Sequence, residues 1–161
     1  MIEIRPADTP TDLDAARALF REYAASLPFS LDYQGFDAEL AALPGKYAPP
    51  LGRILIAWKG STPVGCIAVR PLAAASGDAA PVCEMKRMYV KPEARGLGVG
   101  RALGEELLRV ARSSGYVTMK LDTESDFAAA VGLYRSLGFM ECPRYNDDPM
   151  PNTIWMSKAL T

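Results

Sequence analysis

The stretch that decides the fold reads Glu84-Met-Lys-Arg-Met-Tyr-Val-Lys-Pro-Glu-Ala-Arg-Gly-Leu-Gly-Val-Gly-Arg-Ala-Leu-Gly104. It predicts a strand, a short turn at its proline, a glycine-rich loop and the start of a helix. Gly96, Gly98 and Gly100 stand at every second position. Glycine lets a loop turn tightly and lets a ligand approach the backbone, and the N–H groups at a helix start attract anions. The pattern therefore favours a phosphate-binding turn over a loop that needs glycine only to turn.

The composition indicates one domain spanning residues 1–161. Hydrophobic residues make up 49% and charged residues 23% of the chain, as in ordinary globular proteins. The net charge of -1 gives no broad attraction to nucleic acid or to an anionic membrane. No apolar run approaches the roughly 20 residues of a membrane helix, and the N-terminus lacks the pattern of a secretory signal. We therefore expect a cytoplasmic protein without a nucleic-acid or membrane partner.

Histidine is absent and cysteine is scarce in the chain. Cys66, Cys83 and Cys142 are odd in number and show no Cys-x-x-Cys spacing, so neither a disulfide framework nor a zinc knuckle is expected. The lack of histidine excludes Ser-His-Asp systems, most zinc sites and imidazole bases. We therefore expect no metal, and any catalysis must rely on carboxylates, tyrosine, backbone dipoles or water.

Apolar periodicity and turn signals predict an alternation of strands and helices. Expected strands are 2–6, 53–59, 62–70, 82–90, 117–122, 139–144 and 153–159, and expected helices are 11–27, 36–43, 100–114 and 127–137. A run of small residues at 71–80 is expected to form a mobile loop. This order predicts an α/β fold, with a central mixed, twisted sheet of about seven strands and helices on both faces. The helix at 100–114 should connect two parallel strands.

Two common phosphate-binding motifs do not match the glycine loop. A P-loop requires Gly-x-x-x-x-Gly-Lys-Ser/Thr, which the chain lacks. A dinucleotide fingerprint requires Gly-x-Gly-x-x-Gly, but its last position would be Arg101 or Leu103 here. Asp122 follows the next strand, where such a site has an acid. The glycine spacing nevertheless disfavours a nicotinamide oxidoreductase.

Three segments together resemble the Gcn5-related N-acetyltransferase (GNAT) family. Arg95-Gly-Leu-Gly-Val-Gly100 resembles its Arg/Gln-x-x-Gly-x-Gly/Ala signature. Upstream, Met88-Tyr-Val-Lys-Pro92 is similar to the strand that ends in an apolar-x-Val-x-Pro turn. Downstream, Ala130-Val-Gly-Leu-Tyr-Arg-Ser-Leu-Gly-Phe139 is similar to the segment Ala-x-x-Leu-Tyr-x-x-x-Gly-Phe. The order of elements fits over essentially the whole chain, so the resemblance implies a GNAT-like sheet.

The resemblance implies that a coenzyme A thioester, acetyl-CoA, is the acyl donor. Loop N–H groups would hold the pyrophosphate, and a strand that splays from its neighbour would bind the pantetheine through its backbone. The residues implied are Met88, Tyr89, Val90, Arg95, Gly96, Leu97, Gly98, Val99, Gly100 and Arg101. Many members carry an asparagine three residues before the alanine of the downstream motif. Phe127 stands there in this chain, so one pantetheine hydrogen bond is lost or replaced by packing.

Transfer of an acyl group from a thioester to an amine needs a neutral amine, donors for the oxyanion and a proton for the leaving thiolate. Tyr134 stands at the family's acid position and is expected to protonate the sulfur. Glu84 is the candidate base, because some members carry a glutamate there. It lies four residues before Met88, so strand periodicity places both side chains on one face. A water chain leading to a carboxylate is the alternative.

The acceptor site is expected in the variable parts of the chain. Tyr33, Phe36 and Tyr47 are candidates to shape it, and Asp147 and Asp148 are candidates to attract a cation. The sequence leaves open whether the acceptor is a small molecule or a protein.

The expected function is an N-acetyltransferase that moves an acetyl group from acetyl-CoA to a primary amine, by direct attack through a tetrahedral intermediate. The alternative is a non-catalytic acyl-CoA-binding or regulatory domain on the same fold. Analogy with the family also implies that the chain can form a homodimer.

Overall fold

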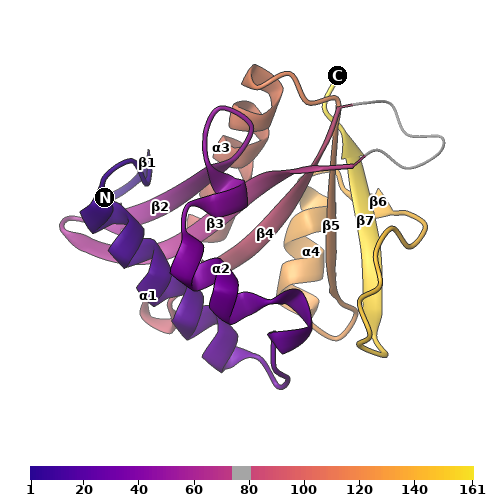
Figure 1. Ribbon diagram of the computed structural model, residues 1–161, viewed down its shortest axis with the longest axis horizontal. Coiled ribbons are helices and arrows are strands. Elements are labelled where there is room, and N and C mark those ends of the chain that lie inside the picture. Colours follow the sequence, from indigo (N-terminus) through magenta and orange to yellow (C-terminus); the bar gives the residue numbers. More distant parts are fainter. Residues whose placement is uncertain (74–80) are drawn as a thin grey trace.

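The computed structural model describes residues 1–73 and 81–161. These residues form a mixed α/β fold (Figure 1). The strands are β1 Ile2–Pro6, β2 Arg53–Lys59, β3 Thr62–Leu72, β4 Val82–Val90, β5 Thr118–Glu124, β6 Met140–Glu141 and β7 Thr153–Ala159. The helices are α1 Pro10–Ser26, α2 Phe36–Ala42, α3 Val99–Ser113 and α4 Ala128–Ser136. The predicted order of elements is confirmed.

One sheet in the order β1-β2-β3-β4-β5-β7-β6 organises the described residues. The pair β4 and β5 is parallel, and every other neighbouring pair is antiparallel. As predicted, α3 connects the two parallel strands. Helices α1 and α2 cover one face of the sheet, and α3 and α4 cover the other (Figure 1). No helix in the described ranges is both long and apolar enough to cross a membrane.

Two hydrophobic cores hold the helices to the sheet. On the α1 face, Phe20 packs with Ile54 and Ile56 of β2. On the α3 face, Leu103 and Leu107 pack among apolar side chains of the central strands. Each helix buries one apolar stripe, which is the pattern that its 3.6-residue periodicity predicts.

The start of α1 lies at the segment Thr9-Pro-Thr-Asp12, a helix-start signal in the sequence. Thr9 Oγ1 accepts a hydrogen bond from the backbone N–H of Asp12 at 3.0 Å, and Asp12 Oδ2 accepts one from the backbone N–H of Thr9 at 3.2 Å. This reciprocal pair is a capping box, which satisfies two donors that a helix start leaves unpaired.

Three expected segments differ in the structure. The predicted strand 139–144 is reduced to β6, because Pro143 lacks the N–H that would continue the ladder. The loop at 44–52 contains a short 3₁₀ turn, Gly45–Tyr47. Strand β3 continues to Leu72, so the expected loop of small residues begins later than predicted. Its residues 74–80 lie outside the described part, and the prediction of a mobile loop there is not tested.

A β-bulge interrupts the alternation of side chains along β4. Lys86 pairs with Ala68 and Tyr89 pairs with Cys66, so two residues of β4 stand opposite the single residue between them on β3. Arg87 lies in this bulge with φ 59°, a left-handed conformation that is uncommon for a residue other than glycine.

The bulge corrects one prediction. Glu84 pairs directly with Arg70, whose neighbours Cys66 and Ala68 at even spacing belong to the core beneath α1. Met88 instead packs against the core beneath α3. The two side chains therefore lie on opposite faces of the sheet, because the extra residue inverts the alternation between them.

Candidate active site

The centre of the sheet is open between β4 and β5. These strands pair only at Val82–Thr118, Cys83–Met119 and Glu84–Lys120, and then part. A cavity of about 600 Å³ lies at this opening, lined by the remainder of β4, the end of β5, α4 and the end of α1. The splay implied by the resemblance is present, and it leaves backbone groups of β4 without a strand partner on the side of β5.

The glycine loop closes one end of this region. Gly96 and Gly98 have φ angles of 78° and 76°, which residues other than glycine rarely adopt. Gly98 is the N-cap of α3, whose first turn has neither a side-chain cap nor an acidic residue. The unpaired N–H groups and the helix dipole suit an anionic ligand such as a pyrophosphate. The loop therefore fits the phosphate-binding turn expected from its sequence.

The remaining loop positions have mixed roles. A Cβ on Gly100 would lie 2.9 Å from Met88 Cε and 3.2 Å from Leu133 Cδ2, so glycine there allows α3 to approach the cavity wall closely. The side chain of Val99 is buried in the core, whereas Leu97 is 57% exposed. Because Val99 is buried and the side chain of Leu97 is apolar, both residues can bind a phosphate only through their backbone N–H groups.

Arg95 and Arg101 differ in their surroundings. Arg95 lines the cavity, and its Nε donates to the Val90 carbonyl at 3.2 Å. The guanidinium of Arg101 instead bonds Glu105 Oε1 at 3.1 Å and Ser136 Oγ at 2.6 Å, and so connects α3 to α4. Arg95 is thus directed at the cavity, while Arg101 is occupied by the two helices.

Tyr134 is buried at the cavity wall, with its ring edge-on to Phe139 at a centroid distance of 6.2 Å. Its hydroxyl makes no hydrogen bond to any residue of the described chain. Burial, together with the charges of Tyr23 and Asp122, raises the pKa of Tyr134 above its ordinary value of 10.0. The phenol therefore stays protonated at neutral pH and can donate a proton. Phe127, where many family members have asparagine, lines the same cavity.

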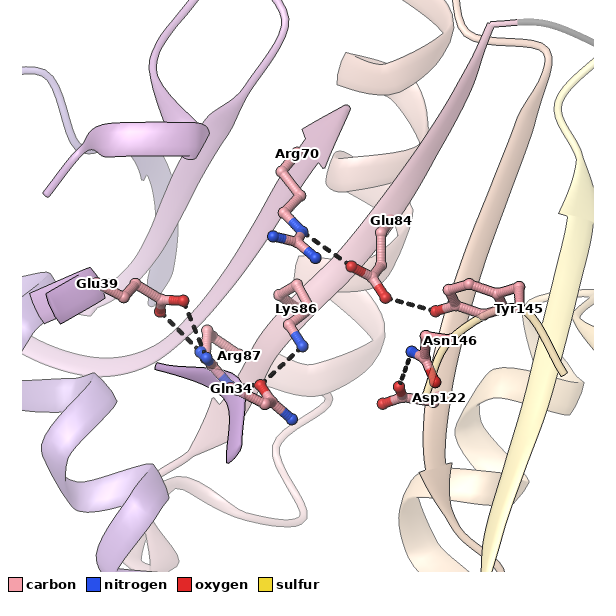
Figure 2. A network of polar contacts seen from close by, with 9 residues as sticks. All are labelled: Gln34, Glu39, Arg70, Glu84, Lys86, Arg87, Asp122, Tyr145 and Asn146. Carbon is pink, nitrogen blue, oxygen red and sulfur yellow. Dashed lines mark hydrogen bonds and ion pairs between the residues drawn. The ribbon is translucent and has the colours of Figure 1, made fainter. Parts of the chain in front are cut away.

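A second, polar cavity of about 270 Å³ adjoins the first and shares lining residues with it. Figure 2 shows many of its side chains, which come from β3, β4, β5 and the segments around Gln34 and Asn146. Its lining consists of Tyr33, Gln34, Glu39, Lys46, Arg70, Glu84, Lys86, Arg87, Asp122, Asn146, Asp147 and Asp148.

Glu84 is buried in the wall of this polar cavity, and both of its carboxylate oxygens are bonded. Oε1 accepts from Arg70 Nε at 2.9 Å, and Oε2 accepts from the Tyr145 hydroxyl at 2.6 Å (Figure 2). Burial and the neighbouring Glu84 carboxylate raise the pKa of Tyr145, so this hydroxyl remains a donor. The carboxylate expected as base is therefore engaged by two fixed donors.

Asp122 lines both cavities. Its Oδ2 accepts from Asn146 Nδ2 at 2.6 Å (Figure 2), and burial raises its pKa. Burial lowers the pKa of the nearby Lys86, whose Nζ donates to Gln34 Oε1 at 2.8 Å. A carboxyl with a raised pKa at the junction of two cavities is well suited to accept a proton.

The bulge residue Arg87 is buried and held from three sides. Its guanidinium pairs with both oxygens of Glu39 at 2.8 and 2.9 Å and donates to Gln34 Oε1 at 2.8 Å. It also lies over the ring of Phe36, 5.0 Å from the centroid. These contacts connect α2 to the bulge and stabilise its uncommon backbone conformation.

The three aromatic residues predicted for the acceptor site separate into two groups. Tyr33 lines both cavities, and its hydroxyl lies 3.3 Å from Asp148 Oδ2. Phe36 and Tyr47 are buried in the core beneath α1 and line neither cavity. The sequence placed Phe36 at an apolar position of a helix and Tyr47 in a loop, and it did not reveal that both face the core.

The two aspartates expected to attract a cation also differ. Asp148 is buried and accepts hydrogen bonds from the Thr153 hydroxyl at 3.0 Å and the Met150 N–H at 2.9 Å. Asp147 is exposed and lines the polar cavity. Asp148 therefore shapes its own loop, while Asp147 contributes charge at the rim.

Comparison with known proteins gives the family. Residues 14–139 match the acetyltransferase (GNAT) family. The chain belongs to this family. An uncharacterized N-acetyltransferase of Schizosaccharomyces pombe is 39% identical over 161 residues, covering 99% of this chain and 96% of that protein.

Solved structures share the GNAT fold. An acetyltransferase of the GNAT family from Staphylococcus aureus is 18% identical with a TM-score of 0.77, covering 100% of both chains. The PaiA N-acetyltransferase of Thermoplasma acidophilum, solved in complex with coenzyme A, is 20% identical with a TM-score of 0.71, covering 99% of both chains. Likeness at these identities shows the fold, and the predicted GNAT-like sheet is confirmed.

Several residues of this GNAT site were not predicted from the sequence. Tyr23, Arg70, Lys86, Tyr145 and Asn146 carry no motif, and most come from segments far apart in the chain. Asp122 was noticed only as the acid of a dinucleotide site. Its position at the end of the predicted strand 117–122 was the one available signal.

Proposed function

We propose that this protein is an N-acetyltransferase that moves an acetyl group from acetyl-CoA to a primary amine. The observation that carries the proposal is the cavity at the β4–β5 splay, which has the buried Tyr134 phenol on its wall and the uncapped start of α3 at the glycine loop. Membership of the GNAT family supports the same reaction class.

The donor would lie along the opening between the strands. The first-turn N–H groups of α3 would hold its pyrophosphate, and the backbone of Met88 and Val90, which has no strand partner on the side of β5, would bond its pantetheine. Arg95, now on the Val90 carbonyl, would turn toward the phosphates. Acetyl-CoA supplies an activated carbonyl carbon, and the chain supplies position, donors and proton transfer.

In the proposed reaction the amine nitrogen attacks the thioester carbonyl carbon directly. A nitrogen–carbon bond forms, and the carbon–sulfur bond breaks as the oxyanion collapses. Tyr134 gives its proton to the departing thiolate, and Asp122 takes the proton that the amine loses. Backbone N–H groups of the splayed β4 would stabilise the oxyanion.

We assign the base to Asp122 rather than to Glu84, which was expected from the sequence. Glu84 has both oxygens occupied by Arg70 and Tyr145, whereas Asp122 lines both cavities and has a raised pKa. In this proposal Glu84 fixes the guanidinium of Arg70. A water chain leading from the amine to Asp122 is compatible with the same arrangement.

Two measurements test the proposal. Acetyl-CoA at millimolar concentration should raise the melting temperature, because a ligand that binds only the folded state stabilises it. A panel of primary amines should then give release of free thiol from acetyl-CoA. A thermal shift without thiol release from any amine would instead support a non-catalytic acyl-CoA-binding domain, and the absence of any shift would refute both.

The base assignment has its own pair of variants. Asp122→Asn should lower kcat by about 10²- to 10⁴-fold, the usual contribution of a positioned acid or base. Glu84→Gln keeps an acceptor for Arg70 and should retain kcat within about an order of magnitude. The reverse pattern would return the base role to Glu84.

A further inference from the structure

The polar cavity has a guanidinium whose outer edge is available to a ligand. Arg70 bonds Glu84 through Nε alone, at 2.9 Å, and its side chain is 26% exposed (Figure 2). Its two terminal nitrogens make no hydrogen bond to any residue in the ranges 1–73 and 81–161. Because Glu84 is itself fixed by Tyr145, the fork is held in position before any ligand arrives. Such a fork matches a carboxylate, which it can bind through two parallel hydrogen bonds.

The β3 side and the β5 side of this cavity carry different charges, while β4 between them carries both signs. Arg70 is on β3, and Lys46 lies in the turn Gly45–Tyr47, which contacts β3. Asp122 is on β5, and Asp147 follows β6. Since β4 separates β3 from β5 in the sheet, the cavity has a cationic side and an anionic side.

We propose that the acceptor is a small amino acid, a molecule that carries a carboxylate as well as the primary amine. This rests on the proposed acetyl transfer. The amine lies at Asp122, next to the donor cavity, and the carboxylate binds the terminal nitrogens of Arg70. Strands β3 and β5 are two strand spacings apart, roughly 10 Å. Arg70 reaches inward from β3 with a long side chain and Asp122 from β5 with a short one, so the site should select acceptors by the distance between their amine and their carboxylate.

Other acceptor classes fit this cavity less well. A polyamine would bring a second cation toward Arg70 and Lys46, which like charges disfavour. A volume of about 270 Å³ suits a small molecule better than a folded protein surface. A phosphate ester beside an amine offers the same anion–cation pairing, so the experiment includes one.

The test compares matched amines as acceptors with acetyl-CoA. The ω-amino acids from β-alanine to 6-aminohexanoate are each paired with the n-alkylamine of the same chain length, and α-amino acids, phosphoethanolamine and spermidine are added. We expect kcat/KM for at least one amino acid to exceed that of its alkylamine by about 10- to 100-fold, the range that a hydrogen-bonded charge contributes.

Arg70→Gln should bring this ratio to within about threefold of one, while the rate with the alkylamine changes little. Because this variant leaves the buried Glu84 without its cation, the double variant Arg70→Gln with Glu84→Gln removes both charges and should lose the same preference. Arg109→Gln, on an exposed arginine of α3, is the control and should keep it.

Each result decides the matter. A ratio near one in the unaltered protein, a ratio that survives both Arg70 variants, or a higher kcat/KM for phosphoethanolamine or spermidine would overturn the amino acid assignment. Acetylation of the alkylamines in those cases would leave the proposed acetyl transfer intact. If no amine releases thiol, the proposed transfer fails, and the acceptor assignment fails with it.

Discussion

Tyr134→Phe should separate catalysis from stability in this protein. The substitution removes one hydroxyl and keeps the ring, with its edge-on contact to Phe139 and its burial in the core beneath α3. The hydroxyl bonds no residue of the described chain, so its loss breaks no protein hydrogen bond. If it alone protonates the leaving sulfur, its loss removes the general acid.

The surroundings of the Tyr134 hydroxyl determine how much the substitution should change stability and turnover. Burying a hydroxyl without a hydrogen-bond partner costs about 1–3 kcal/mol of folding free energy. Because Tyr134 lines a cavity that can hold water, the substitution should recover less than this full cost. We expect a free energy of unfolding between unchanged and about 1 kcal/mol higher, or a melting temperature up to about 4 °C higher. The value of kcat should fall by about 10²- to 10⁴-fold.

Tyr116→Phe is the matched control. Tyr116 is also buried on the α3 face, but its hydroxyl donates to the Leu51 carbonyl at 2.6 Å, and it lines neither cavity. It should lose about 1 kcal/mol of stability and keep its turnover. The assays are thermal unfolding and thiol release with the best acceptor of the amine panel. A Tyr134→Phe protein with kcat within about twofold of the unaltered one would remove Tyr134 from the mechanism.

Three further substitutions and a pH profile test other parts of the structure. Asp122→Asn should raise the melting temperature at neutral pH. The raised pKa of Asp122 means that the protein loses folding stability as the pH rises through that pKa, and the substitution removes this loss while its amide oxygen still accepts from Asn146. The increase in melting temperature should therefore vanish in acid, where Asp122 is protonated. Gly98→Ala should lose about 1–2 kcal/mol, since no atom lies within 4 Å of the new Cβ but φ is positive, and should reduce the thermal shift with acetyl-CoA. Gly132→Ala, in open space within α4, should instead gain about 0.5–1 kcal/mol. Because the pKa of Tyr134 is raised, kcat should show no fall up to about pH 10, the ordinary tyrosine value; a fall near pH 8 would contradict its role as acid.

Much of the fold was predictable because its signals are local. The capping box at Thr9, the turn at Gly60 and the glycines before α3 each fix an element boundary through residues that are neighbours in the chain. Strand β6 was overestimated because one proline matters more than an apolar pattern at a sheet edge.

The donor side of the candidate site was predictable for the same reason, since its residues follow one another from Met88 to Arg101. The polar cavity was not predictable, because it depends on contacts between distant segments. Tyr145 reaches Glu84 across 61 positions, and Gln34 reaches Lys86 across 52. Nor did any sequence pattern indicate that Glu84 and Met88 lie on opposite faces of the sheet, since the bulge at Arg87 contains no glycine that would have predicted it.

That bulge has a consequence for how the protein can vary. Glu84 and Lys86, which precede Arg87 on β4, reach the polar cavity on one face, whereas Met88 and Val90 pack on the other face beside the proposed donor. Substitutions at Glu84 and Lys86 can therefore change the acceptor without altering the packing that supports acetyl-CoA. Deleting the extra residue of the bulge would leave both sets on their present faces, because Lys86 and Met88 would then alternate as neighbours in a regular strand. Acceptor range and donor binding are in this sense separately adjustable traits encoded within a single nine-residue strand.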